Sequence, residues 1–270
     1  MRRLSLRALL SEPPQARGPR VAAVDSSPAP RAPLLSLFAQ TYRSVVRHAP
    51  LYLLTSLIVV GLEGLVVFTW HSAAATPVAS VVLEPFFVTI VAAFSYADLR
   101  DDWTPSGVWL RVLERSWAVL LIDLLFQLVL ALGIESLAVP DLFSRLMGAA
   151  VVMIGVSLVF ADVAATVTDD AEPWWWLVPR SLGASMAVAW QRVAFARALI
   201  VFALLDLFPE SVVSIVQPLL AQHHVPQPAY WANAISVILL SPPFQALCTF
   251  VYLDAIGMKR SALAPDDTVK

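Results

Sequence analysis

The chain has 270 residues, of which 59% are hydrophobic and 14% are charged, and its mean hydropathy is +0.73. Soluble globular proteins have roughly a quarter charged residues, so this chain needs lipid as its solvent, and a water-soluble enzyme is excluded. The net charge of −2 argues against a nucleic-acid partner, which usually requires a basic face. The single cysteine, Cys248, excludes an intrachain disulfide.

Two tails flank the predicted membrane domain. Residues 1–33 scatter arginines among prolines, alanines and serines, which predicts a disordered, basic cytoplasmic tail. A signal peptide is not expected, because the apolar run Leu4–Leu10 is short and is interrupted by Arg7. Residues 34–258 form the membrane domain, and residues 259–270 form a short cytoplasmic tail.

The first part of the membrane domain is predicted to be an interfacial helix followed by a helical hairpin. Pro33–Ala49 has the helical period, with apolar residues on one face and Arg43 and Arg47 on the other, which is typical of a helix in the membrane interface. Leu51–Trp70 and Pro77–Ala97 are each about long enough to cross a hydrocarbon core of roughly 30 Å.

The same layout recurs twice. The second and third interfacial pieces are Pro105–Arg115, with Trp109 and Arg111, and Glu172–Gln191, with Trp174, Trp175, Trp176 and Arg180. The corresponding crossings are Ser116–Leu137, Leu146–Val167, Val193–Phe208 and Tyr230–Leu253. The sequence therefore predicts an all-α polytopic membrane bundle of six transmembrane helices, built as three repeats of an interfacial helix plus a helical hairpin. The tryptophans and arginines of the lead-in pieces are expected to be interfacial anchors.

Charge distribution predicts the orientation of this bundle. With six crossings and the N-terminus inside, every lysine and arginine except Arg145 falls on the cytoplasmic side. Because basic residues collect on the cytoplasmic side of membrane proteins, both termini are expected in the cytoplasm. Arginine far outnumbers lysine, and alanine and valine are abundant, which is typical of a GC-rich bacterial genome and predicts a bacterial inner membrane.

Carboxylic acids inside the predicted spans are the one feature that points to chemistry. Glu63 and Glu84 are expected at one depth on neighbouring helices, and Asp123 and Asp162 at another; Asp206 lies near the end of its helix. Ionisable groups at such depth often mark ion or proton paths. They also act as polar contacts that hold helices together, and the sequence leaves both interpretations open.

The remaining motifs in the sequence do not indicate a specific function. Pro85, Pro242 and Pro243 are expected to kink their helices, as in transporters and in many other membrane proteins. The adjacent His223 and His224 lack a third metal ligand at a useful spacing. The sequence contains no nucleotide-binding, zinc-protease or nucleophile-elbow motif, so we expect no enzymatic activity, no cofactor and no metal.

Several short segments resemble the membrane domain of the glycerophosphoryl diester phosphodiesterase membrane-domain family. They are Phe38–Arg47, Pro85–Arg100, Trp176–Ser181 and Pro243–Asp254, within a likeness that spans about residues 34–260. Ile256 stands where the family pattern leads us to expect an arginine. Fusions in that family carry the phosphodiesterase on a separate soluble domain, which this sequence lacks. The resemblance therefore implies a six-helix membrane fold with an accessory role and no catalysis.

Two functional hypotheses follow from the sequence. The first is a non-enzymatic membrane protein that organises lipid or a partner protein, with membrane lipids, another protein or a second copy of the chain as partners. The second is a transporter or channel for a small or proton-coupled solute that uses the intramembrane carboxylates. Neither involves nucleic acid.

Overall fold

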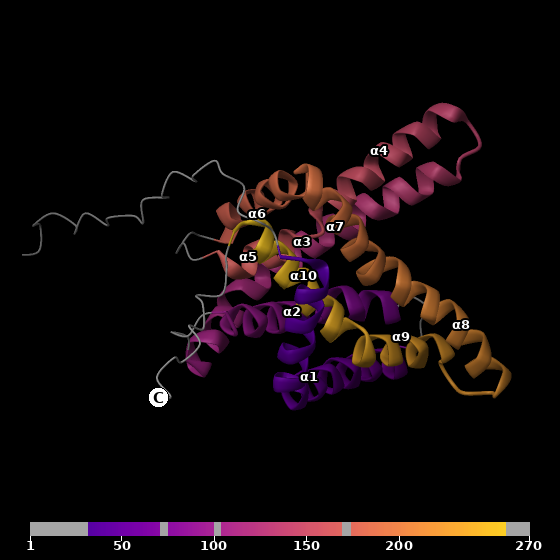
Figure 1. Ribbon diagram of the computed structural model, residues 1–270. Coiled ribbons are helices and arrows are strands. Elements are labelled where there is room, and N and C mark those ends of the chain that lie inside the picture. The colour runs from indigo at the N-terminus through magenta and orange to yellow at the C-terminus, as the bar shows by residue number, and fades with distance from the viewer. Residues whose placement is uncertain (1–31, 71–74, 100–103, 169–173, 258–270) are drawn as a thin grey trace, which may run out of the picture. The chain divides into compact units, whose positions relative to one another are not determined.

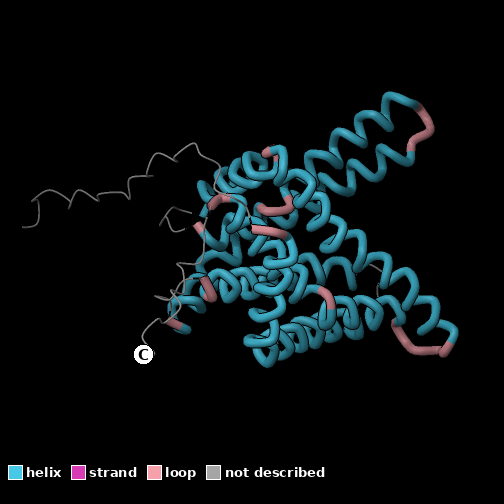
Figure 2. The backbone as a smooth tube through the Cα atoms, in the orientation of Figure 1, coloured by secondary structure: helices cyan, strands magenta, loops and turns pink. Residues whose placement is uncertain are grey.

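The computed structural model describes residues 32–70, 75–99, 104–168 and 174–257, and these residues form helices and short turns without a β-strand (Figures 1 and 2). The predicted tails lie outside the described residues, except for Ala32 and Pro33. The helices are α1 (Leu34–Trp70), α2 (Ala75–Ala97), α3 (Pro105–Ala138), α4 (Leu142–Leu158), α5 (Ala161–Val167), α6 (Trp174–Ala189), α7 (Arg192–Phe202), a π-helical segment (Ala203–Leu207), α8 (Phe208–Gln222), α9 (Pro228–Leu239) and α10 (Ser241–Ala255).

The described helices have the length and composition of a multi-pass membrane protein. Five helices are long and apolar enough to cross a membrane, and there are six if α9 and α10 together make one span bent by 46°. The crossing after α3 combines α4 with α5, and the fifth crossing runs from α7 through the π-helical segment into α8. The all-α membrane bundle predicted from the sequence is confirmed.

The helix boundaries differ from the prediction in two ways. The first two lead-in pieces run without a break into their crossings, α1 through Pro50 and α3 from Pro105 onward, and only α6 is separate from the helix that follows it. Proline is tolerated inside membrane helices, because local adjustments satisfy the carbonyl that it leaves free. The fifth crossing, expected to end at Phe208, continues to Gln222, and the turn after it contains two residues with positive φ, His224 and Gln227.

The interior of the bundle is built on α2, α5 and α10. Val91 on α2, Val163 on α5 and Leu253 on α10 are each 0% exposed, and they belong to one continuous apolar cluster. By contrast, one face of α1 leaves Leu54 and Ile58 more than half exposed. A large exposed apolar face is a liability in water, whereas it is the expected contact surface in lipid.

Small residues allow α3 and α4 to pack closely. The two helices lie side by side as an antiparallel hairpin (Figure 1). Gly133, Gly148 and Gly155 lie at their contact, and a Cβ added at Gly148 would lie 2.7 Å from the backbone nitrogen of Leu137 and 2.8 Å from the carbonyl oxygen of Gly133. Glycine at this position therefore sets the distance between the two backbones.

We predict that Gly148→Ala destabilises the folded protein by about 1–3 kcal/mol, because the new methyl group meets backbone atoms that cannot move aside. Thermal unfolding of the purified protein in detergent measures the loss. Gly61→Ala is the matched control, because a Cβ at Gly61 meets nothing within 4 Å. Equal unfolding midpoints for the two variants would contradict the close packing of α3 and α4.

Candidate functional site

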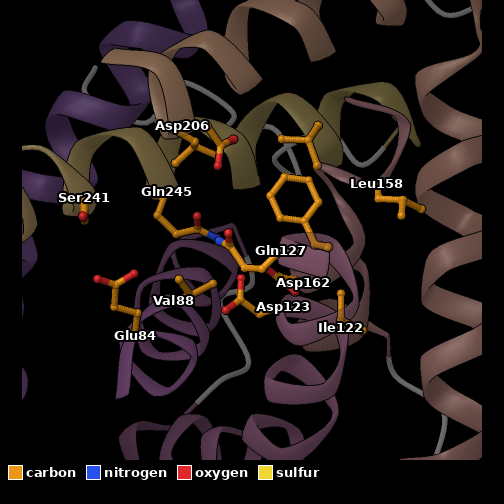
Figure 3. Close-up of a pocket in the computed structure, with 13 residues that line it drawn as sticks. Glu84, Val88, Ile122, Asp123, Gln127, Leu158, Asp162, Asp206, Ser241 and Gln245 are labelled. Atoms are coloured by element: carbon orange, nitrogen blue, oxygen red, sulfur yellow. The ribbon is translucent and has the colours of Figure 1, made fainter. Parts of the chain in front are cut away.

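A polar cavity lies where six elements of the bundle meet, and five of them supply its polar groups (Figure 3). Its volume is about 120 Å³, whereas a single water molecule needs roughly 10–15 Å³ of such space. The cavity can therefore hold several waters or a small solute. Its polar lining consists of Glu84 from α2, Asp123 and Gln127 from α3, Asp162 from α5, Asp206 from the π-helical segment, and Ser241 and Gln245 from α10.

Each element that lines the cavity, apart from α3, has a break or a proline at that point. Asp162 stands in the first turn of α5, directly after the break from α4. Asp206 lies in the π-helical segment, and Ser241 lies at the bend between α9 and α10. Glu84 directly precedes Pro85 inside α2. Non-helical backbone at membrane depth is tolerated where it is buried in protein or lines a cavity.

The break between α4 and α5 is held open by a serine from another helix. Ser185 of α6 is fully buried, its hydroxyl donates to the carbonyl of Ser157 at 2.8 Å, and it accepts the N–H of Phe160 at 3.1 Å. Backbone groups that a continuous helix would have paired are thus satisfied by a side chain. This role could not be predicted from the sequence, because Ser185 lies in the segment Glu172–Gln191, which was expected to be interfacial.

The π-helical segment has a local cause in Pro209. Proline in a helix lacks an N–H and its ring clashes with the carbonyl four residues earlier, here that of Leu205. The chain adapts by widening, so that the N–H of Phe208 donates to the carbonyl of Ala203 five residues back. Such π turns are frequent at functional sites, and this one contains Asp206.

The cavity is acidic and has no cationic partner in its lining. It contains four carboxylic acids, and none of its lining residues is lysine, arginine or histidine. Carboxylates buried in a membrane without a counter-charge are costly, so they are usually paired or face water and ligands. Within the described residues, no three His, Cys, Asp or Glu side chains come together closely enough to hold a metal ion.

Glu63 lies in a neighbouring cluster and does not line the cavity. Its side chain is fully buried, and its Oε1 accepts from Ser80 at 2.9 Å and from Asn233 at 3.1 Å. Its Oε2 has no hydrogen-bond partner among the described residues. Asn233 also donates to the hydroxyl of Ser80 at 3.2 Å. Of the two glutamates, only Glu84 lines the cavity.

The other predicted carboxylates line the same cavity. Asp123 and Asp162 both line the cavity, and Asp206, which the sequence placed only near a helix end, lines it too. The amides of Gln127, Asn233 and Gln245 were missed. Polar residues in apolar runs are themselves a signal at these positions: Gln127 follows Asp123 by one helical turn on α3, and Gln245 follows the predicted Pro242–Pro243 kink.

The predicted interfacial anchors divide into two groups. Trp175 and Trp176 are each more than 60% exposed, Arg43 and Arg180 are exposed, and Trp109 is partly exposed with its ring against Phe94. Arg111 is half-buried and donates to the carbonyls of Thr166 and Thr168, which ties the end of α5 to α3. The side chain of Trp174 lies outside the described residues.

Arg47 takes part in a polar cluster around Asp98, where α2 ends. Asp98 accepts from the hydroxyl of Ser44 at 2.6 Å and from Arg47 at 3.0 Å, and His48 Nε2 lies 3.0 Å away. Burial by itself would raise the pKa of Asp98, but the hydrogen bonds with His48 and Ser44 and the charge of Arg47 together hold it below its ordinary value. A second ion pair joins Arg197 to Asp254 at 2.6 Å.

Comparison of the chain with models of known protein families, with curated proteins and with solved structures gives no match.

We predict that Asp98 makes stability depend on pH at acidic values. Its pKa is lower in the folded protein, so its contribution is present above the unfolded pKa of about 3.9 and is lost as the pH falls through the folded value. Asp98→Asn should cost roughly 1.5–3 kcal/mol near neutral pH, because it removes the charged acceptor, and should lack this acid loss. Thermal unfolding across the acidic range measures both, with Glu114→Gln as an exposed control. An unchanged pH profile in Asp98→Asn would contradict the assignment.

Proposed function

We propose that the protein is a membrane transporter or channel for a small cationic or proton-coupled solute. The observation that carries the proposal is the acidic cavity at the meeting point of the helix breaks. The cavity lies among elements of the membrane-spanning helices, and its carboxylates attract cations and carry protons. The adjoining breaks supply places at which helices can pivot.

The mechanism follows from these groups. A cation or proton enters the cavity and interacts with Glu84, Asp123, Asp162 and Asp206, which compensates their charge. The bend between α9 and α10 and the π-helical segment beside α8 then allow one side of the cavity to close while the other opens.

The proposal also includes the membrane in which the protein lies and its orientation there. We propose that both termini lie in the cytoplasm, because basic residues concentrate on one side of the six crossings, and that the membrane is a bacterial inner membrane, because the composition is rich in arginine, alanine and valine. The likeness of Pro85–Phe86 and Pro243–Phe244 to the membrane-domain family supports the same six-crossing layout. In this proposal the protein acts on a solute without chemically changing it.

We predict that Glu84→Gln lowers the rate of cation or proton uptake into proteoliposomes by about tenfold or more, because it removes a carboxylate that faces the cavity. Uptake is followed with an internal pH dye or an isotope while a membrane potential is imposed. Glu135→Gln on the exposed face of α3 is the control and should retain the wild-type rate.

Size-exclusion profiles establish that both variants are folded, and Asp206→Asn provides a second cavity variant in case Glu84→Gln is unstable. The proposal is contradicted if no cation or proton from a broad panel moves through the wild-type protein, or if both cavity variants transport at the wild-type rate.

A second candidate function is an accessory protein that organises anionic lipid. It is favoured by a hollow of about 70 Å³ at the end of α2, lined by Arg43, Arg47, Gln40 and Phe250 among others. Arg43 and Arg47 lie one helical turn apart on α1, and the side chain of Arg47 is 68% exposed although it pairs with Asp98. Basic pockets on the cytoplasmic side of membrane proteins bind lipid phosphates.

For this function we predict that native mass spectrometry detects anionic phospholipid retained on the wild-type protein. Arg43→Gln should reduce retention by roughly half or more, since it removes about 1 kcal/mol of attraction to the lipid phosphate. Arg145→Gln, on the opposite side of the bundle, should retain lipid like the wild type. Equal retention in the two variants would rule out the hollow as a lipid site.

A further inference from the structure

The distribution of charge around the cavity restricts the chemical class of solute that can bind there. Its four carboxylic acids come from α2, α3, α5 and the π-helical segment, so they surround the space and do not converge on one point (Figure 3). A dehydrated metal ion needs several oxygen ligands at about 2.0–2.6 Å. Within the described residues no set of three acidic or metal-ligating side chains is close enough to provide them. A single compact cation therefore fits this lining poorly.

Apolar side chains alternate with the acids. Val88 lies one turn from Glu84 on α2, and Ile122 and Phe126 flank Asp123 on α3. Leu205 precedes Asp206 in the π-helical segment. A solute with positive groups separated by methylene groups matches this alternation, because each ammonium meets a carboxylate and the methylenes lie against the apolar side chains. Phe126, whose aromatic ring is of the type that attracts cations, also lines the cavity.

One buried polar side chain besides the acids points to a missing ligand. Gln245 lines the cavity and is only 5% exposed, and among the described residues its side-chain amide has no hydrogen-bond partner. Unsatisfied polar atoms in a native interior call for water, an ion or a ligand. An ammonium group can donate to the amide oxygen of Gln245 and to a carboxylate of the lining.

We infer that the cavity binds a short aliphatic amine that carries two or more ammonium groups. The inference rests on the proposed function and names its solute class. It assigns one ammonium to the Asp123–Asp162–Gln245 side of the cavity and the other to the Glu84 or Asp206 side. The methylene chain lies between them against Val88 and Leu205.

The test compares ligands on the wild-type protein in nanodiscs of zwitterionic lipid, because anionic lipid would itself bind amines. Isothermal titration calorimetry measures the Kd of butane-1,4-diamine, butylamine and Mg²⁺, with empty nanodiscs as the blank. Butylamine has the same chain length with one charge, and Mg²⁺ has the same charge without the chain. We expect the diamine to bind about tenfold or more tightly than either.

Variants then locate the binding site. Asp123→Asn and Asp206→Asn should each raise the Kd of the diamine by roughly tenfold, and Glu135→Gln should leave it unchanged, because Glu135 lies on the same helix outside the cavity. No heat with the diamine, equal affinity for Mg²⁺ or butylamine, or unchanged binding in both aspartate variants would overturn the inference. The ligand comparison needs no variant and therefore stands even if a substitution prevents folding.

The two proposals fail in different ways. If the diamine binds as expected but is not moved across proteoliposome membranes, the transport function fails and the ligand class stands. If protons or inorganic cations are transported while the diamine does not bind, the ligand class fails and the transport function stands.

Discussion

The constraint on which this structure depends is the presence of four carboxylic acids inside a lipid-facing bundle, in a cavity lined by no basic residue. Burying charge in a low-dielectric medium costs free energy, and here no side chain of the lining offsets the cost through an ion pair. The basic residues that are paired lie elsewhere, as in Arg47 with Asp98 and Arg197 with Asp254. The cavity therefore depends on protons, water or a cationic solute for its compensation.

The breaks in the helices and the polar residues of the cavity lie at the same places. A polar side chain satisfies backbone groups that the break between α4 and α5 leaves free, and the breaks leave space for polar side chains. A membrane helix is broken only where another group satisfies the freed backbone atoms, as Ser185 does between α4 and α5. Pro209 widens the helix at Asp206, and Pro242 and Pro243 begin the helix that contributes Gln245. Regular helices would fill this volume with apolar side chains. The breaks instead leave a space that polar groups from five elements can face, and the same breaks supply the flexibility that solute exchange requires.

Most features that depend on residues close together in the sequence could be predicted, whereas features that depend on contacts between distant segments could not. Apolar runs near 20 residues predicted the membrane bundle, because lipid imposes that length on each crossing. Glu84, Asp123 and Asp162 could be singled out because a charge in such a run is conspicuous. Their convergence with Asp206 and Gln245 could not be predicted, because it depends on how helices far apart in sequence pack. The continuity of α1 through Pro50 was missed for the opposite reason: the amphipathic pattern changed at that proline, whereas the backbone continued as a helix.

The central claim is that the acidic cavity is accessible to water inside a membrane-embedded bundle. Cysteine labelling in a Cys248→Ala background tests it most directly, using Gln127→Cys in the cavity lining and Leu124→Cys on the exposed apolar face of the same helix. Thiols react with a small charged methanethiosulfonate reagent as thiolates, which form where water reaches them. The account predicts that the cysteine at position 127 is labelled in intact membranes and that the one at position 124 is not. Failure to label position 127, or equal labelling of the two positions, would contradict it.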